Sequence, residues 1–194
     1  MLLRAGEPAD AGELHVLTRA AFLVEGQRYG DLHLPPLLEQ VQDVTAALSD
    51  PATAVLVAEA EGDEGLGRAG RIIGTVRLHL RAGEQAEADA GGAVLEAELA
   101  RLAVAPDAHR RGIADALMGA AERVAARAGA GEVALFTGAA SAGNLALYRR
   151  RGYREVPRPA GAPQGDLVFL RKALTPAPDE LDRADAGGAG SDVV

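Results

Sequence analysis

The sequence predicts a mixed α/β fold: a central, mostly antiparallel twisted sheet of six to seven strands with about four helices. Short runs of apolar and β-branched residues, typical of strands, alternate with longer stretches whose apolar residues recur at helical spacing. One helical stretch lies between two predicted strands. It therefore predicts a parallel strand–helix–strand crossover, which is right-handed in nearly all proteins.

The first quarter of the chain predicts one strand and two helices. Leu2 to Ala5 forms the strand, and Pro8 then stands where the first turn of a helix tolerates proline. The helical spacing that follows is carried by Leu14, Leu17, Ala20, Ala21 and Val24. A second helix is expected after Pro36 and ends at Asp50-Pro51. Its apolar face comprises Leu37, Leu38, Val41, Val44, Ala47 and Leu48.

Three strands are expected next. Ala54 to Ala58 and Ile72 to Leu80 are apolar runs that pair naturally as a hairpin. The third strand, from about Val94 to Val104, contains a conflict. Leu99 and Leu102 are an odd number of positions apart, so strict alternation directs them to opposite faces. One extra residue near Ala100-Arg101, a β-bulge, would reconcile them.

The last third of the chain predicts two helices and three strands. The first helix runs from Ile113 to near Gly129. Val133 to Phe136 is a short apolar run, so we expect a strand buried on both faces. A short helix from about Gly143 to Arg151 and the strands Tyr153 to Val156 and Leu167 to Leu170 complete the expected fold.

The composition is that of an ordinary globular protein. The chain has 194 residues, of which 48% are hydrophobic and 25% charged, enough for one domain with its own core. We expect that domain to span residues 1–174. Residues 175–194 contain prolines, five acids and a run of small residues, which predicts a disordered acidic tail.

Several classes of protein are excluded by what the sequence lacks. Without cysteine there is no disulfide framework, thiolate metal site or cysteine nucleophile. No apolar run approaches the roughly 18 residues that span a bilayer, and acids stand near the N-terminus where a signal peptide needs bases. A net charge of -8 opposes general binding to nucleic acid. We expect a cytoplasmic protein without membrane or nucleic-acid partners, and a homodimer is left open.

The charge is unevenly distributed. Residues 1–98 hold seven Lys and Arg against seventeen Asp and Glu, whereas residues 99–158 hold ten against five. The basic segment predicts an anionic ligand.

Four other patterns carry little functional weight. The G-x-G-x-x-G pattern at residues 65–70 precedes a predicted strand, whereas dinucleotide binding needs a helix there, so we expect a hairpin turn. Ser141 lacks the flanking glycines of a G-x-S-x-G nucleophile and is expected at the entry to a helix. The four histidines are scattered, so no metal site is predicted. Arg149 to Arg151 lack interleaved aromatic residues and fit a solvated helix end.

The strongest signal is the segment from His109 to Ala114. It places two arginines and a glycine at the start of a predicted helix, where free backbone N–H groups and the helix dipole favour an anion. Its position makes the signal more specific, because the segment joins the strand with the predicted bulge to the crossover helix within the basic segment.

The same segment resembles the GNAT superfamily of acyl-CoA-dependent N-acetyltransferases. The family pattern of Leu-x-Val, a proline and [Gln or Arg]-x-x-Gly-x-[Gly or Ala] corresponds here to Leu102 to Ala114. The run from Asn144 to Tyr153 is similar to the family's Asn-x-x-x-Tyr helix and following Gly-aromatic strand. The resemblance covers roughly residues 2–172 and implies the GNAT fold.

The resemblance implies acetyl-CoA as co-substrate, with no metal. The backbone of Leu102, Ala103 and Val104 would align the pantetheine. The pyrophosphate would lie on the backbone of Arg110, Arg111, Gly112, Ile113 and Ala114. His109, Asn144 and Tyr148 complete the implied cofactor site. His109 stands where the family usually has Gln or Arg, so a permanent charge or an amide is replaced by a ring that is mostly neutral at pH 7.

The resemblance also implies two catalytic groups for direct attack of an amine on the thioester. Tyr148 would protonate the departing thiolate; its alternative is simple packing. Glu98 would accept the amine proton, directly or through water. Glu96 lies on the same face and is a second candidate, and a surface strand glutamate is the alternative for both.

The leading function is therefore transfer of an acetyl group to a primary amine of a small molecule. A protein or peptide N-acetyltransferase is one alternative, and a non-catalytic acyl-CoA sensor is another. The resemblance implies that the acceptor is selected by residues 22–38 and about 158–166. The acidic charge of residues 1–98 favours a cationic amine, and the sequence leaves the identity of that amine open.

Overall fold

The computed structural model describes residues 1–62, 70–82 and 95–175. One seven-stranded sheet runs through these residues in the order β1-β2-β3-β4-β5-β7-β6. All neighbouring strands are antiparallel except the parallel pair β4 and β5. The strands are β1 (Leu2–Ala5), β2 (Thr53–Glu59), β3 (Ile72–Ala82), β4 (Leu95–Val104), β5 (Glu132–Gly138), β6 (Arg154–Val156) and β7 (Leu167–Ala173). The predicted mixed fold with one parallel crossover is confirmed.

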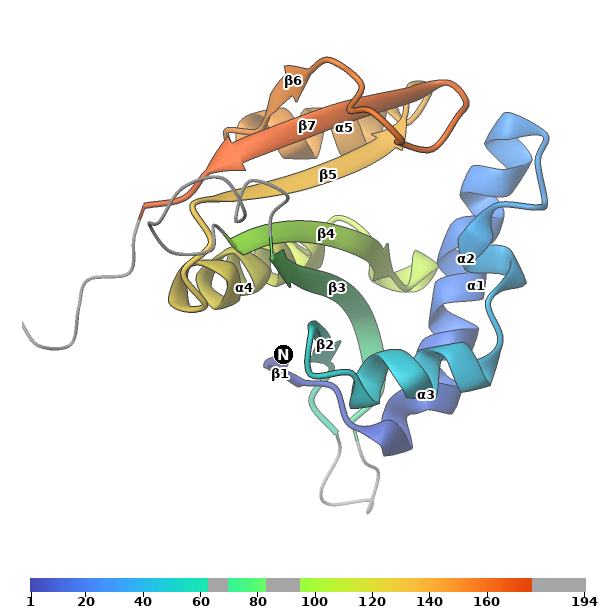
Figure 1. The fold of residues 1–194 in the computed structure, drawn as a ribbon. Coiled ribbons are helices and arrows are strands. Elements are labelled where there is room, and N and C mark those ends of the chain that lie inside the picture. The colour runs from blue at the N-terminus through green and yellow to red at the C-terminus, as the bar shows by residue number, and fades with distance from the viewer. Residues whose placement is uncertain (63–69, 83–94, 176–194) are drawn as a thin grey trace, which may run out of the picture.

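Five α-helices accompany the described strands. They are α1 (Ala11–Tyr29), α2 (Pro35–Leu38), α3 (Val41–Ser49), α4 (Ile113–Arg127) and α5 (Ala142–Arg150). Single 3₁₀ turns precede α1 at Pro8–Asp10 and α4 at Pro106–Ala108. In Figure 1, α1 to α3 gather on the right-hand side, whereas α4 and α5 lie behind the strands.

The single helix predicted after Pro36 is wrong, because the chain forms two helices there. Glu39 follows α2 with an extended ψ of 136°, and α3 begins two residues later with Gln40 as its N-cap. The interruption turns the Glu39 carboxylate toward Arg77 of β3, which donates two hydrogen bonds of 2.6 and 2.9 Å to it. The chain therefore forms the buried ion pair between Glu39 and Arg77 and not one continuous helix with a single apolar face.

The β-bulge predicted in the third strand is confirmed in β4. Arg77 of β3 lies opposite Ala100, whereas Thr75 lies opposite Ala103, so β4 has one residue more than its partner over this interval. Arg101, within the bulge, has a positive φ of 53°. A non-glycine residue in this region costs about 1–3 kcal/mol, so the surrounding structure must hold it there.

The core lies between the strands and the helices α1, α3 and α4. Fully buried side chains from these elements include Val57, Val76, Leu78, Leu117, Met118, Val133 and Leu170. The expectation that β5 is buried on both faces is wrong. Val133 and Leu135 face the core, but Phe136 is 39% exposed on the other face. That face is open because β4 diverges from β5 alongside it.

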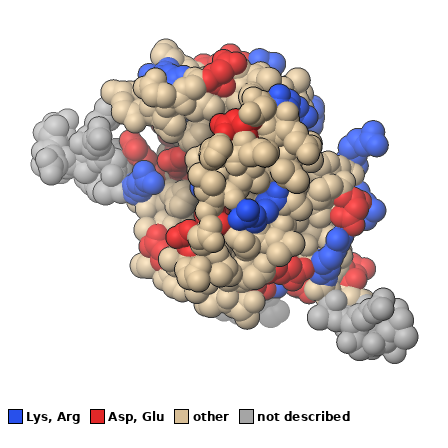
Figure 2. Space-filling view, turned by 90° about the vertical axis from the view of Figure 1, so that its right-hand side faces the viewer, with Lys and Arg blue, Asp and Glu red and all other residues tan. Residues whose placement is uncertain are grey.

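The side of the molecule formed by α1 to α3 is mostly uncharged, with separate charged side chains that include a basic one near its centre (Figure 2). Val16, Leu23, Leu32 and Leu38 are among the exposed large apolar side chains of these helices and their connection. No helix in the described part of the chain is long and apolar enough to cross a membrane. The expected turn at residues 65–70 and the tail after residue 175 fall almost wholly outside the described residues.

Candidate active site

Strands β4 and β5 pair along only part of their length. In their parallel register, Ala97 pairs with Val133 and Glu98 pairs with Ala134. Both strands are fully described, and they form no further pairs with each other after Glu98 and Ala134. The strands then separate, as Figure 1 shows, and a cleft of about 900 Å³ begins where they part. Its walls come from α1, α2, the bulged half of β4, the start of α4, the end of β5, α5 and residues 163–167.

The bulged half of β4 directs backbone groups into this cleft. The Ala105 N–H donates to the carbonyl of Ile73 on β3, at 2.9 Å. Because successive residues of a strand direct their backbone groups to opposite sides, Leu102 and Val104 direct theirs away from β3, toward the gap before β5. An extended ligand chain could therefore hydrogen-bond to this edge as an additional strand.

The turn between β4 and α4 has the backbone geometry that suits an anionic ligand. Arg110 and Gly112 have positive φ values of 62° and 76°, and α4 begins immediately afterwards at Ile113. The first N–H groups of a helix have no intrahelical acceptor and carry partial positive charge. A Cβ on Gly112 would meet no atom within 4 Å, so its backbone conformation, not crowding, requires glycine. Arg110, Gly112, Ile113 and Ala114 line the cleft.

His109 and Arg111 both contact the backbone around this turn, but only His109 also lines the cleft. His109 Nε2 lies 3.0 Å from the carbonyl oxygen of Val104. A carbonyl can only accept, so the imidazole donates and fixes the turn against the end of β4. Arg111 is not among the cleft-lining residues. Its guanidinium lies 3.4 Å from the backbone carbonyl of Asp107.

Asn144 and Tyr148 both line the opposite wall of the cleft, one turn apart on α5. Tyr148 is only 5% exposed. Burial, and secondarily the negative charge of Glu25, raises the pKa of Tyr148 to about 12. The phenol is therefore protonated at neutral pH and available as a proton donor.

The two predicted carboxylate bases lie further from the cleft. Glu98 is half-exposed on β4, its carboxylate 4.0 Å from the guanidinium of Arg81. Glu96 is exposed on the same strand. Neither is among the cleft-lining residues, so either would need water to reach a bound amine.

Sequence reasoning missed a polar cluster that joins α1 to the start of α5. The Ser141 hydroxyl donates to Glu25 at 2.5 Å and lies 3.0 Å from the hydroxyl of Tyr29. A Cβ on Gly138 would collide with the Tyr29 hydroxyl, so glycine permits this close approach. Ser141 is the N-cap residue of α5, as expected from the sequence. The cluster is formed by residues more than a hundred positions apart, so no local pattern in the sequence could indicate it.

A family model matches residues 19–153, that of the acetyltransferase (GNAT) family. No curated protein matches the sequence significantly.

Solved structures share the fold at low sequence identity. A ribosomal-protein-alanine N-acetyltransferase from Brucella melitensis is 21% identical with a TM-score of 0.66, over 90% of this chain and all of that one. Arabidopsis thaliana NAA60 bound to a bisubstrate analogue is 18% identical with a TM-score of 0.70, over 91% and 99% of the two chains. A PaiA N-acetyltransferase from Thermoplasma acidophilum in complex with coenzyme A is 16% identical with a TM-score of 0.65, over 90% and 100%.

Proposed function

The chain belongs to the GNAT acetyltransferase family, and we propose that it transfers an acetyl group from acetyl-CoA to the primary amine of a small molecule. The carrying observation is the cleft between the separated strands β4 and β5, which has an anion-binding helix start at one end and a protonated tyrosine in its wall. Acetyl-CoA, when bound, supplies the acetyl group as a thioester.

The residues present fit this donor. The backbone N–H groups at the start of α4, with Arg110 beside them, suit a pyrophosphate because they combine donors with positive potential. The edge of β4 at Leu102 to Val104 suits an amide-containing chain, since its backbone groups face the gap. The Val104 carbonyl already accepts from His109. The backbone N–H of Val104 is the group that would stabilise the negative charge developing on the thioester oxygen.

Glu98 and Tyr148 take the two proton transfers in this proposal. Glu98, through water, removes a proton from the ammonium group, which frees the nitrogen lone pair. The nitrogen then forms a bond with the acetyl carbon, the carbon–sulfur bond breaks, and the nitrogen loses its second proton to water. Tyr148 gives its proton to sulfur and recovers one from solvent. The products are an N-acetylamine, coenzyme A and one proton.

A small acceptor is favoured by how the cleft is bounded. The hydrogen-bonded cluster of Glu25, Tyr29 and Ser141 joins α1 to α5 along one side. Leu34, Pro35 and Pro36 line another part of the wall. These contacts restrict the space available to an extended polypeptide. Acetylation of a protein or peptide amine is the alternative within the family.

The test is a screen for free thiol released from acetyl-CoA in the presence of polyamines, aminoglycosides, amino acids or peptides. We expect release that depends on one class of small amine, with mass spectrometry showing its N-acetyl product. Release only with peptides would replace the small-molecule acceptor. Affinity for acetyl-CoA without turnover for any acceptor would support a sensor instead.

A further inference from the structure

We propose that Arg101 binds a carboxylate group of the substrate, which makes the acceptor an amino acid or a related amine carrying a carboxylate. The inference rests on the proposed acetyl transfer and adds the chemical class of the acceptor. It comes from three properties of Arg101: its position, its burial and the arrangement of its charged neighbours.

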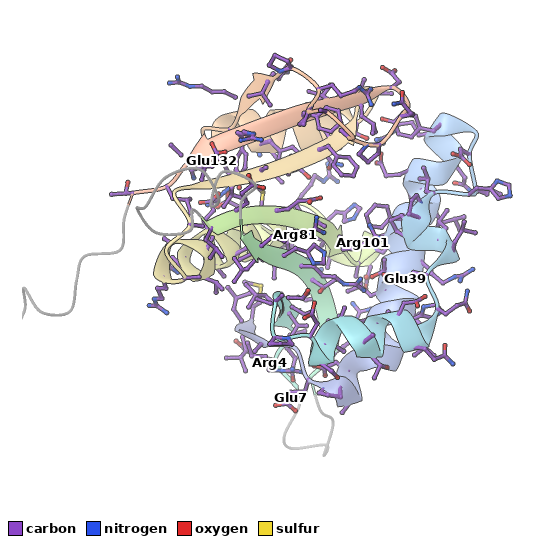
Figure 3. All side chains as sticks on the ribbon, in the orientation of Figure 1. Arg4, Glu7, Glu39, Arg81, Arg101 and Glu132 are labelled. Atoms are coloured by element: carbon purple, nitrogen blue, oxygen red, sulfur yellow. The ribbon has the colours of Figure 1, made fainter. Side chains whose placement is uncertain are left out.

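The β4 bulge positions Arg101 at the cleft. Its positive φ of 53° places it in a conformation that arginine rarely adopts, and its side chain lines the cleft together with Leu34, Pro35 and Pro36. In Figure 3, Arg101 lies at the bulged end of β4, close to Glu39. The strained backbone is therefore maintained where the guanidinium reaches the part of the cleft bordered by α1 and α2.

Arg101 is a largely buried cation without a hydrogen-bond acceptor. Its side chain is 26% exposed, and its Nε is buried with no partner among the described residues. Burial, and secondarily the like charge of Arg77, lowers the pKa of Arg101. The negative charges of Glu39 and Glu98 act on this pKa in the opposite direction. Buried charges are normally paired, and a guanidinium is the side chain best suited to bind a carboxylate through two hydrogen bonds.

The acidic neighbours of Arg101 have other partners. Both carboxylate oxygens of Glu39 accept short hydrogen bonds from Arg77, and Glu39 lies 3.7 Å from Arg101 Nε without a hydrogen bond. Glu98 adds a favourable charge, but the guanidinium nearest to it is that of Arg81. A substrate carboxylate in the cleft would accept hydrogen bonds from the terminal nitrogens of the Arg101 guanidinium, which donate none to the described residues.

The position of Arg101 separates this site from the pyrophosphate site. Arg101 precedes the β4 edge at Leu102 to Val104, whereas the anion-binding turn follows that edge and begins at Arg110. The carboxylate could belong to the acceptor or to the acyl group of the donor, because both would meet near the bulge. We assign it to the acceptor, because Arg101 shares its part of the wall with residues of the α1–α2 connection.

The experiment compares L-amino acids with their α-amides as acceptors for acetyl-CoA. In the wild type, kcat/KM for the L-amino acids should exceed kcat/KM for their α-amides by at least about tenfold, because this is the contribution of one charge-assisted hydrogen bond. Arg101→Met should reduce this ratio to near one, Arg101→Lys should restore part of it, and the KM for acetyl-CoA should stay unchanged. Arg81→Gln is the matched control, since it removes an exposed charge from the adjacent strand, and it should keep the wild-type ratio. An unchanged ratio in Arg101→Met, or a wild-type preference for amides, would overturn the proposal.

Two further arms separate the remaining outcomes. Succinyl-CoA replaces acetyl-CoA, with amides as acceptors; a preference for it that Arg101→Met abolishes would assign the carboxylate to the donor and overturn our assignment. Binding of N-acetyl amino acids and N-acetyl amino amides to the CoA-loaded protein is also measured by calorimetry. Tighter binding of the acids, lost in Arg101→Met, supports the carboxylate site even if no acceptor turns over. Equal binding counts against it, even if acetyl transfer is confirmed.

Discussion

Tyr148 combines two properties that an acid catalyst needs: it lines the cleft, and it keeps its proton at neutral pH. Burial is the main cause of its raised pKa, and the negative charge of Glu25 acts in the same direction. Its ring packs against Tyr153 with centroids 6.0 Å apart, which fixes its orientation. Tyr148 is therefore suited to donate a proton to a group bound in the cleft.

Replacing Tyr148 by phenylalanine should reduce kcat by about a hundredfold or more, the usual contribution of a general acid. The packing against Tyr153 is retained, so the dissociation constant for acetyl-CoA should change little. Steady-state kinetics and calorimetry measure the two quantities. Unchanged turnover would remove Tyr148 from this role, and weakened acetyl-CoA binding with normal kcat would make it a binding residue.

Replacing His109 by arginine should tighten acetyl-CoA binding about two- to fivefold, because a permanent charge joins the pyrophosphate site; a partly exposed ion pair contributes about 0.2–1 kcal/mol. Arginine can also donate to the Val104 carbonyl that His109 contacts. Titration calorimetry at two salt concentrations checks this, since the gain should shrink with added salt. No gain at low salt would contradict the prediction.

The predictable part of the site is the part encoded locally. The anion-binding turn, Asn144 and Tyr148 are contiguous motifs, and all border the cleft except Arg111 of the turn, whose guanidinium lies near the Asp107 carbonyl. The sequence did not indicate that three further residues line the cleft: Arg101, Glu25 and Phe136. The position of each depends on tertiary structure. The bulge presents Arg101, α1 brings Glu25 to Ser141, and the divergence of β4 exposes Phe136.

At the level of elements, two sets of contacts hold the walls of the cleft in place. Tyr29, at the end of α1, contacts the corner between β5 and α5 through Ser141 and Gly138. On the other side, Arg151 follows α5 and binds Asp115 and Glu122 of α4 at 2.8 Å each. Arg151 had been expected at a solvated helix end, but its side chain is only 15% exposed.

Gly138→Ala should disturb the contact between α1 and α5. The added methyl group meets the Tyr29 hydroxyl, and such overpacking costs about 1–3 kcal/mol in the free energy of unfolding. Denaturant titration measures the loss. The control is the same substitution in Tyr29→Ala, where the collision is absent and the cost should fall. Equal costs in the two backgrounds would show that Tyr29 is not the obstacle.

Glu122→Gln should destabilise the protein by about 1–3 kcal/mol at neutral pH, because the carboxylate accepts hydrogen bonds from Arg151 and Lys172. Burial opposes ionisation, but these hydrogen bonds outweigh it and lower the pKa of Glu122. Its contribution is thus complete above the ordinary carboxyl pKa of 4.5 and disappears as pH falls through the lower folded value. Chemical unfolding at several pH values should show the two proteins converging in acid. A difference that persists at low pH would contradict this.

The elements themselves could be predicted where periodicity and turn residues agree. The β4 bulge followed from the odd spacing of two leucines, and the crossover followed from one helix between two strands. The division between α2 and α3 could not be predicted, because it depends on an ion pair between Glu39 and Arg77, 38 positions apart.

At the scale of the whole molecule, the charge distribution fits the proposed placement of two substrates. The basic segment, residues 99–158, contains the anion-binding turn and α5, on the donor side of the cleft. The acidic first half contributes Glu25 and Asp31 to the cleft wall. These carboxylates suit an ammonium group, and Arg101 nearby suits a carboxylate, so an amino acid would satisfy both charges.

Initial velocities with both substrates varied test the acetyl-transfer proposal most directly. Release of coenzyme A should require the amine acceptor, and double-reciprocal lines should intersect, because direct attack needs both substrates bound together. Parallel lines would indicate a covalent acetyl-enzyme, and release that is absent or independent of every amine would contradict acetyl transfer in this cleft.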